Sequence, residues 1–357
     1  MPDTSFTITE NMPLEERLQG ARLFCSRMTE WVKGRGRIII ILHDNPDPDC
    51  LASALALHHI FTSLIEEEPT IAFSGMIARS ENLIMAKILE IPLVPLEIID
   101  LSNFGVICML DTQPGAGNNS LGADAVVDIV IDHHPLKEMT RRCRWVDVRD
   151  HYGVTATILY EYLLAFDLEI GPELATAIFY AIKSDTQDLG REASSPDKEA
   201  YLKLFPAVDK QFLCQIMNPR QPPEYFSALR KAIDNARVYG RAVVADMKNV
   251  AFPELVAEMA DFLLKLEGVD TVLAYGEYSQ EMVLSIRSVT DDLNAGEMMR
   301  RVLDGIGSGG GHSNMAGGKI SDLPAGADDL IRLQALLTGR FLKELGLADM
   351  EPVLIGN

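Results

Sequence analysis

Paired cysteines, long apolar runs and an excess of positive charge are all missing from this sequence of 357 residues. Its five cysteines stand apart and form no Cys-x-x-Cys pair, which argues against a structural zinc site and favours reduced thiols in a cytoplasmic protein. No apolar stretch is long enough to span a bilayer, and the first residues lack the basic and apolar regions of a signal peptide. We therefore expect a cytoplasmic protein with no membrane partner.

The charge balance restricts the partners further. The formal net charge is −20, because 52 Asp and Glu residues outnumber 32 Lys and Arg residues. Long nucleic acids bind through many phosphate contacts and would be repelled, so we expect no long duplex as a partner. A small anionic ligand needs only a local binding site.

Four short segments rich in Asp and His are present instead, each at the end of an apolar run. They are 43–49 (His-Asp-Asn-Pro-Asp-Pro-Asp), 111–113 (Asp-Thr-Gln), 132–134 (Asp-His-His) and 184–186 (Ser-Asp-Thr). The runs before the first three, residues 37–42, 106–110 and 125–131, predict buried strands of a parallel sheet. Ligands bind beyond the carboxyl ends of such strands, so these side chains should converge. Oxygen and imidazole donors suit Mn²⁺, Mg²⁺ or Zn²⁺, which indicates a metal-dependent active site.

The remaining pattern alternates strands with helices, and it predicts an α/β protein. Helices are expected at 13–34, from Asp49, at 80–90, 154–166 and 173–184, and then at 253–266, 295–303 and 325–345. A cluster of prolines between residues 206 and 224 suggests a boundary between two domains, and strands near 241–246, 271–275 and 282–288 predict a smaller α/β domain after it.

A glycine-rich segment, residues 307–318, is the main signal in the second half. Six glycines in twelve residues could present successive backbone N–H groups to an anion, whereas a plain flexible loop is the alternative. His312 at the end of the glycine run and Arg287 on a neighbouring strand favour phosphate recognition.

Together these motifs resemble those of the DHH/DHHA1 phosphoesterases, in order and over about residues 20–345. The resemblance is strongest to the two-domain nanoRNase/pAp-phosphatase and stand-alone cyclic-dinucleotide phosphodiesterase type. It implies a larger parallel-sheet DHH domain, a smaller α/β DHHA1 domain and a cleft between the two lobes. It also implies two Mn²⁺ ions, with Mg²⁺ or Co²⁺ as substitutes.

The resemblance also implies residue roles. The first metal would be held by His43, Asp47 and Asp111, and the second by Asp49, Asp111, His133 and Asp185, so that Asp111 bridges. His134 would face the scissile phosphate, and Asp132 would orient an imidazole. Substrate would be held by Arg287, Gly309, Gly310, Gly311 and His312. Pro48 departs from the glycine of many relatives and should stiffen the first motif, while the roles of Cys50, His151 and Arg191 stay open.

The implied activity is hydrolysis of short oligoribonucleotides or of linear or cyclic dinucleotides to 5′-nucleotides, by a phosphodiesterase that could be a homodimer. A pyrophosphatase or exopolyphosphatase, and a nucleotide-binding regulator without activity, remain alternatives. The expected divisions are an N-terminal extension (1–20), the DHH domain (21–215), a linker (216–235), the DHHA1 domain (236–345) and a C-terminal tail (346–357).

Overall fold

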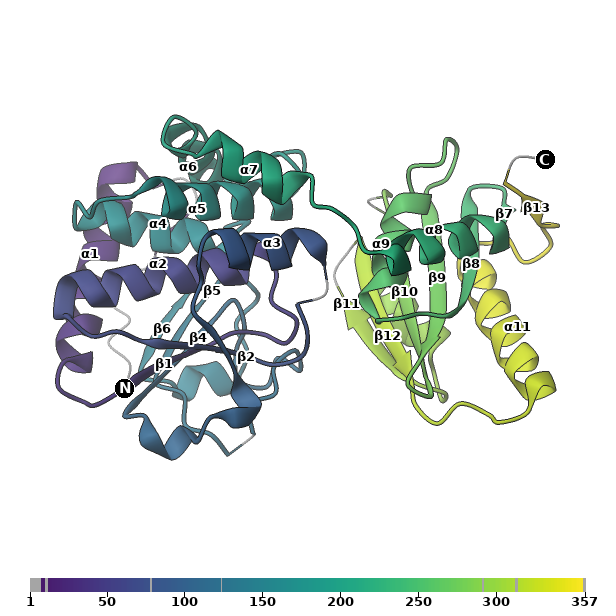
Figure 1. Ribbon diagram of the computed structural model, residues 1–357, viewed down its shortest axis with the longest axis horizontal. Helices are drawn as coiled ribbons and strands as arrows, with labels where there is room; N and C mark the ends of the chain where they lie inside the picture. The colour runs from purple at the N-terminus through teal and green to yellow at the C-terminus, as the bar shows by residue number, and fades with distance from the viewer. Residues whose placement is uncertain are drawn as a thin grey trace. The chain divides into compact units, whose positions relative to one another are not determined.

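The computed structural model describes residues 8–9, 12–77, 79–122, 124–290, 292–311 and 314–355. The chain divides into two compact units, Met1–Pro219 and Arg220–Asn357, and each is described by itself (Figure 1). Both units are α/β, as the sequence predicts. Among the described residues, no helix combines the length and the apolar character that crossing a membrane requires.

Unit 1 is built on a six-stranded sheet of order β3-β2-β1-β4-β5-β6, in which every neighbouring pair is parallel. The strands are β1 (Ile38–Ile41), β2 (Thr70–Phe73), β3 (Leu93–Pro95), β4 (Val106–Leu110), β5 (Ile129–Asp132) and β6 (Trp145–Val148). The strand expected at 125–131 begins only at Ile129, because pairing with β4 starts there and Val126 is exposed.

Helices and short 3-10 turns cover the two faces of this sheet. They are α1 (Leu14–Val32), α2 (Pro48–Ile65), α3 (Ser80–Ile88), α4 (Thr155–Ala165), α5 (Pro172–Asp185), α6 (Ser195–Leu204), α7 (Lys210–Met217), η1 (Leu96–Ile98), η2 (Leu101–Asn103) and η3 (Met139–Arg142). Along β1, Ile38 and Ile40 pack with α1, α2, α4 and α5, whereas Ile39 and Ile41 join a cluster that includes the 3-10 segments. A strand with two covered faces needs apolar residues throughout, which explains its run of isoleucines.

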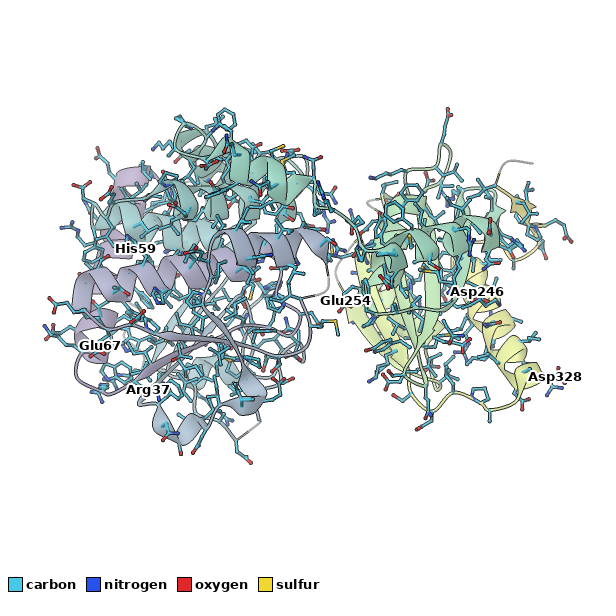
Figure 2. All side chains as sticks on the ribbon, in the orientation of Figure 1. Arg37, His59, Glu67, Asp246, Glu254 and Asp328 are labelled. Atoms are coloured by element: carbon cyan, nitrogen blue, oxygen red, sulfur yellow. The ribbon has the colours of Figure 1, made fainter. Side chains whose placement is uncertain are left out.

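Unit 2 is built on a seven-stranded mixed sheet of order β11-β12-β10-β9-β8-β7-β13, in which only β8 and β9 are parallel neighbours. The strands are β7 (Ala236–Tyr239), β8 (Ala242–Asn249), β9 (Thr271–Tyr278), β10 (Glu281–Ser288), β11 (Ser308–Gly311), β12 (Met315–Ile320) and β13 (Val353–Leu354). The helices are α8 (Pro223–Asn235), α9 (Glu254–Leu263), α10 (Ala295–Val302) and α11 (Ala327–Glu344). Helices α8 and α9 pack on one face and α10 and α11 on the other, and apolar side chains fill the space between (Figure 2).

Three predicted divisions of the chain differ from the structure. The expected linker, 216–235, is largely helix α8, which buries Ala228 and Ala232 against the sheet of unit 2. The expected tail, 346–357, contributes β13 to the same sheet. The expected extension, 1–20, contains the start of α1, where Arg17 is buried. Contacts with residues distant in sequence place the first and last of these segments within the units, since Arg17 pairs with Glu161 and β13 pairs with β7.

The glycine-rich segment is also not a loop. Residues Ser308–Gly311 form the edge strand β11, which pairs with β12. The glycines let α10 approach closely, because a Cβ at Gly309 would lie 2.7 Å from Cγ of Met299 and one at Gly296 would lie 2.3 Å from the carbonyl oxygen of Gly311. The glycine run is therefore explained by helix packing as well as by any role in binding.

Candidate metal centre

The Asp and His segments converge at the carboxyl ends of three adjacent strands in unit 1. His43 follows β1, Asp111 follows β4, and Asp132 ends β5. Asp47 caps the start of α2, where its carboxylate accepts a hydrogen bond from the backbone N–H of Cys50 at 3.0 Å. Pro48 occupies the first turn of α2, where the missing N–H costs nothing. Asp185 is the last residue of α5.

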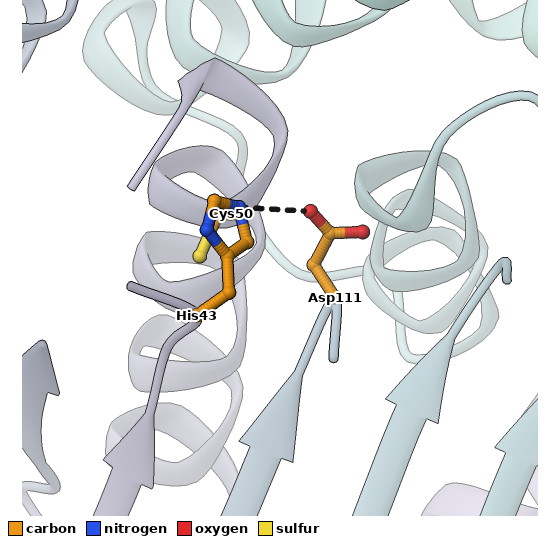
Figure 3. Close-up of side chains that lie close together, drawn as sticks. All are labelled: His43, Cys50 and Asp111. Carbon is orange, nitrogen blue, oxygen red and sulfur yellow. Dashed lines mark ion pairs between the residues drawn. The ribbon is translucent and has the colours of Figure 1, made fainter. Parts of the chain in front are cut away.

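His43 is oriented toward the carboxylates of Asp47 and Asp111, and Figure 3 shows the one of Asp111. Its Nδ1 lies 2.9 Å from the carbonyl oxygen of Asp44, which can only accept, so Nδ1 carries the proton of a neutral ring. Its Nε2 lies 3.4 Å from Oδ1 of Asp47 and 3.5 Å from Oδ2 of Asp111. Such an imidazole, held at one nitrogen and open at the other, is typical of a metal ligand.

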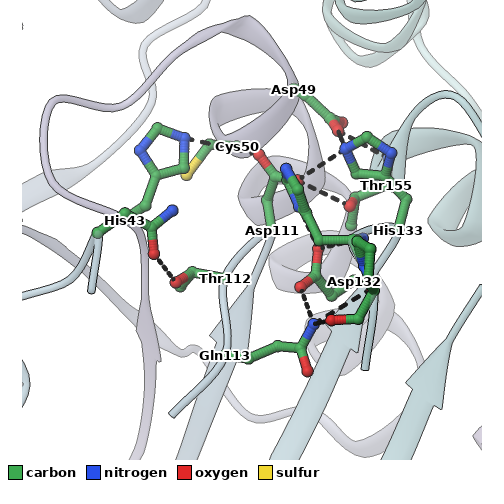
Figure 4. A network of polar contacts seen from close by, with 12 residues as sticks. His43, Asp49, Cys50, Asp111, Thr112, Gln113, Asp132, His133 and Thr155 are labelled. Carbon is green, nitrogen blue, oxygen red and sulfur yellow. Dashed lines mark hydrogen bonds and ion pairs between the residues drawn. The ribbon is translucent and has the colours of Figure 1, made fainter. Parts of the chain in front are cut away.

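A second group forms on the other side of Asp111 (Figure 4). Nε2 of His133 lies 3.5 Å from Oδ1 of Asp111 and 4.0 Å from Oδ2 of Asp49, while its Nδ1 lies 3.1 Å from the carbonyl oxygen of Tyr152. Donor atoms of Asp49, His133 and Asp185 lie within 4.8 Å of one another. This group resembles the first, because in each a histidine has Nδ1 at a backbone carbonyl oxygen and Nε2 toward carboxylates.

Asp111 connects the two groups, because it presents Oδ2 to His43 and Oδ1 to His133. Its side chain is 3% exposed and also accepts a hydrogen bond of 2.9 Å from Oγ1 of Thr155. Its φ of +56° is left-handed, which is costly for a residue other than glycine. A carboxylate held this firmly between two clusters is suited to bridging two cations.

Asp49 is held by the start of helix α4. Its two oxygens accept hydrogen bonds of 2.7 Å from the backbone N–H groups of Thr155 and Ala156. The positive end of that helix stabilises negative charge at Asp49. Thr155, the first residue of α4, was not predicted as a site residue.

Asp132 pairs with His134. Its Oδ1 lies 2.8 Å from Nδ1 of His134, and its Oδ2 accepts a hydrogen bond of 2.7 Å from the amide of Gln113. Burial would lower the pKa of His134, but the hydrogen bond to Asp132 and the charge of Asp111 raise it to about 9. The same pairing lowers the pKa of Asp132 against the effect of its burial. Gln113 was not predicted, although it follows Asp111 by only two positions.

The crowded carboxylates also perturb one another. Burial and the charges of Asp111 and Asp185 raise the pKa of Asp49 well above its usual value, and burial with neighbouring charges does the same for Asp185. Burial would raise the pKa of Asp47, but the charge and hydrogen bond of His43 lower it to about 2. Without cations, protons must offset this negative charge. The donor set of oxygens and imidazoles fits Mn²⁺ or a similar divalent ion, and the residues present can hold such ions.

The predicted substrate residues lie in unit 2. Arg287 is on β10, where its Nε donates a hydrogen bond of 2.6 Å to Oδ1 of Asp261. Gly309, Gly310 and Gly311 lie on β11. His312 lies outside the described residues.

Two residues left open by the sequence lie in unit 1. Arg191 follows a turn in which Gln187, Asp188 and Leu189 all have positive φ, and its charge acts on Asp185. Its Nε is buried and has no hydrogen-bond partner among the described residues. His151 packs edge-on against the ring of Tyr152.

Comparison with known families agrees with these motifs. The profile of the DHH family, N-terminal domain, matches residues 37–182, and the profile of the DHHA1 domain matches residues 240–341. The chain belongs to the DHH family. The DHH match contains every predicted metal ligand except Asp185, which lies three positions beyond it, and the DHHA1 match contains Arg287 and the glycine run.

Individual proteins also show similarity to this chain, either over part of its length or at low sequence identity. An uncharacterized protein of Methanocaldococcus jannaschii is 38% identical over 288 residues, which are 79% of this chain and 58% of the relative. A probable manganese-dependent inorganic pyrophosphatase of Staphylococcus aureus is 28% identical over 144 residues, which are 40% of this chain and 46% of the relative. The chain therefore spans about half the length of these two curated relatives. An exopolyphosphatase-related protein of Bacteroides fragilis shares the fold, with a TM-score of 0.70 at 16% identity over 90% of this chain and 98% of that structure.

Proposed function

We propose that this DHH-family protein is a two-metal-dependent phosphodiesterase that hydrolyses short oligoribonucleotides, or linear or cyclic dinucleotides, to 5′-nucleotides. The observation that carries the proposal is the position of Asp111, with one carboxylate oxygen toward His43 and the other toward His133. One carboxylate shared by two imidazole-containing groups is what a pair of cations requires.

We propose two Mn²⁺ ions as the cofactor, with Mg²⁺ or Co²⁺ as substitutes. The first would be held by His43, Asp47 and Asp111, and the second by Asp49, Asp111, His133 and Asp185. The Staphylococcus aureus relative is a probable manganese-dependent pyrophosphatase, which supports this choice. When bound, such ions lower the pKa of an attacking water and offset negative charge on the phosphoryl oxygens.

The residues of the chain supply the rest of the reaction. Water attacks phosphorus, the bond to the ribose 3′-oxygen breaks, and that oxygen takes up a proton. Asp132 holds Nδ1 of His134 by a hydrogen bond and so orients the ring, and in the proposed reaction the imidazole donates a hydrogen bond to a phosphoryl oxygen. A fixed donor of this kind stabilises charge that grows in the transition state.

The DHHA1 domain supports a nucleotide as the substrate. Arg287 offers a guanidinium that Asp261 holds in place, and a guanidinium can bind a phosphate with two hydrogen bonds. The net charge of −20 favours a short substrate, since a long polymer would be repelled over the remaining surface. We also propose a cytoplasmic location, because all five cysteines are free thiols.

Pyrophosphate or polyphosphate hydrolysis is the second candidate, and the similarity to the pyrophosphatase of Staphylococcus aureus favours it. The two candidates share the metal centre and differ in the leaving group. A nucleotide-binding regulator without activity is the third, but the structure retains a carboxylate or imidazole at every predicted metal position.

A substrate panel tests the proposal. Purified protein with Mn²⁺ would be assayed against linear dinucleotides, cyclic di-AMP, cyclic di-GMP, 3′-phosphoadenosine phosphate, pyrophosphate and polyphosphate, with the Asp111→Asn variant as the control for contaminating activity. We expect release of 5′-nucleotides by the unsubstituted protein alone. Turnover of pyrophosphate or polyphosphate without turnover of any nucleotide would select the second candidate, and turnover of none would select the regulator.

A further inference from the structure

Cys50 lies inside the metal centre, although no function has been assigned to it above. Its Sγ, a ring nitrogen of His43 and a carboxylate oxygen of Asp111 all lie within 4.8 Å of one another. Figure 3 shows its sulfur beside the imidazole of His43, and its side chain has no exposed surface. The thiol is therefore next to the donors that face the first predicted cation.

The start of helix α2 holds this thiol in place. Cys50 is in the first turn of α2, and its backbone N–H donates to the carboxylate of Asp47, itself a predicted ligand. The sulfur and the carboxylate are thus positioned by the same turn. Cys25, Cys108 and Cys143 are also buried, but among the described residues only Cys50 joins His and Asp in a group able to hold a metal.

We propose that Cys50 supplies a thiolate ligand to the cation held by His43 and Asp111, so that this site prefers thiophilic divalent ions such as Zn²⁺, Co²⁺, Fe²⁺ or Cd²⁺. Typical bond lengths are about 2.3 Å to sulfur and about 2.0–2.2 Å to nitrogen or oxygen, so ligand atoms around one ion lie up to about 4.5 Å apart. In a tetrahedral arrangement the ligand atoms lie about 3.3–3.7 Å apart, so the observed group, whose atoms lie within 4.8 Å of one another, would contract on binding. On binding, the thiol proton passes to solvent and a metal–sulfur bond forms.

The consequence is a difference between the two sites. The second group contains only oxygen and imidazole donors from Asp49, Asp111, His133 and Asp185, which suits Mn²⁺ or Mg²⁺. A soft thiolate at the first group would favour a different ion there. The inference rests on the metal centre of the proposed function, but it requires no particular substrate and no turnover.

Absorption spectroscopy tests the proposal directly. Metal-free protein would be titrated with Co²⁺ and, separately, with Cd²⁺, and the sulfur-to-metal charge-transfer band would be recorded. All measurements would use a Cys214→Ser background, because the thiol of Cys214 is exposed and could bind added metal. We expect a band that saturates at one equivalent in this background. The band should disappear in Cys50→Ser and Cys50→Ala and persist in Cys108→Ala, which removes a buried thiol outside the group.

Competition between metals gives a second readout. Cys50→Ser should weaken Cd²⁺ binding relative to Mn²⁺ binding by at least about tenfold, whereas Cys108→Ala should leave the ratio unchanged. Circular dichroism and Mn²⁺ binding show whether each variant has folded. The proposal is wrong if the Cys214→Ser protein shows no charge-transfer band, or if the band has the same intensity after the further change Cys50→Ala. The thiol would then only pack behind the imidazole.

The outcome is separable from that of the proposed function. Mn²⁺-dependent nucleotide hydrolysis without a charge-transfer band overturns only the role of Cys50. A band without hydrolysis of any nucleotide overturns only the phosphodiesterase.

Discussion

The amide of Gln113 donates a hydrogen bond of 2.7 Å to Oδ2 of Asp132, and both side chains are almost completely buried. Oε1 of Gln113 accepts in turn from the backbone N–H of Lys137 and from Oγ1 of Thr140. Gln113 is thereby fixed at both ends of its amide, and it fixes Asp132, whose other oxygen meets His134.

Replacing Gln113 tests this arrangement. Gln113→Leu should lower kcat by about ten- to a hundredfold with little change in KM, because Asp132 loses the donor that orients it while the metal ligands remain. Steady-state kinetics on a substrate found in the panel would measure the effect. Equal Mn²⁺ affinity in variant and parent is the necessary control, and an unchanged kcat would contradict the role of Gln113.

Asp111→Asn should abolish hydrolysis, since both predicted cations lose a charged ligand. Calorimetric titration should then show fewer Mn²⁺ ions bound per chain, while the circular dichroism spectrum stays that of the folded protein. Retention of two tightly bound ions in this variant would rule out the bridging role.

Removing metal should make stability depend on pH in a defined direction. The pKa values of His43, Asp49 and Asp185 are raised, and that of His134 rises from 6.5 to about 9. The folded metal-free protein therefore holds more protons than the unfolded chain, so its stability should fall as pH rises from about 5 to about 9.

Thermal unfolding of EDTA-treated, desalted protein at several pH values measures this slope. Added Mn²⁺ should raise Tm, and the gain should grow with pH because cations replace protons. In His134→Ala the slope between about pH 6.5 and about pH 9 should be smaller. A Tm of the metal-free protein that increases across this window would refute the charge assignment.

Arg287→Ala should raise the KM for a nucleotide substrate by about ten- to a hundredfold, because a charge-assisted hydrogen bond to phosphate contributes about 1.5–3 kcal/mol. A minimal chromogenic phosphodiester, which can react at the metal centre alone, should be affected much less. Arg241→Ala is the matched control, since Arg241 is an exposed arginine of the same unit. Equal losses on both substrates would show that Arg287 does not select the nucleotide.

Glu161→Ala should destabilise the protein by about 1.5–3 kcal/mol, because it would remove a buried acceptor from Arg17 and Arg149, which would keep only Glu199 and Asp147 as acidic partners. Glu161 accepts hydrogen bonds from them at 2.7 Å and 2.6 Å, and so joins α1 to α4. Urea unfolding would measure the change. Glu138→Ala, at an exposed ion pair with Arg141, should change stability by no more than about 0.5 kcal/mol.

Much of the candidate site followed from local sequence. The isoleucines of β1, the run before Asp111 and the run before Asp132 each predicted a buried parallel strand, and parallel strands bring their carboxyl ends to one edge. That rule is enough to collect His43, Asp111 and His133 without any knowledge of tertiary contacts. The family profiles then confirmed the family that the same motifs had suggested.

Other features depended on contacts between distant residues. The glycine run was expected to present backbone N–H groups to an anion, with a flexible loop as the alternative. Pairing with β12 makes Ser308–Gly311 an edge strand, and the close approach of Met299 leaves no room for a side chain at Gly309. The expected linker was polar and rich in proline, yet most of it is helix α8, whose Ala228 and Ala232 are buried in a core.

The amino-acid sequence by itself determined the α/β class, the parallel sheet of unit 1 and the set of candidate Asp and His ligands, because strand periodicity and motif order are local properties. Only the tertiary structure decided how those ligands are held. It directed the two oxygens of Asp111 to different imidazoles, placed Asp49 at the start of α4, set Gln113 against Asp132 and brought the thiol of Cys50 to His43. Such contacts join side chains across strands and helices, and their geometry arises only when the whole unit packs.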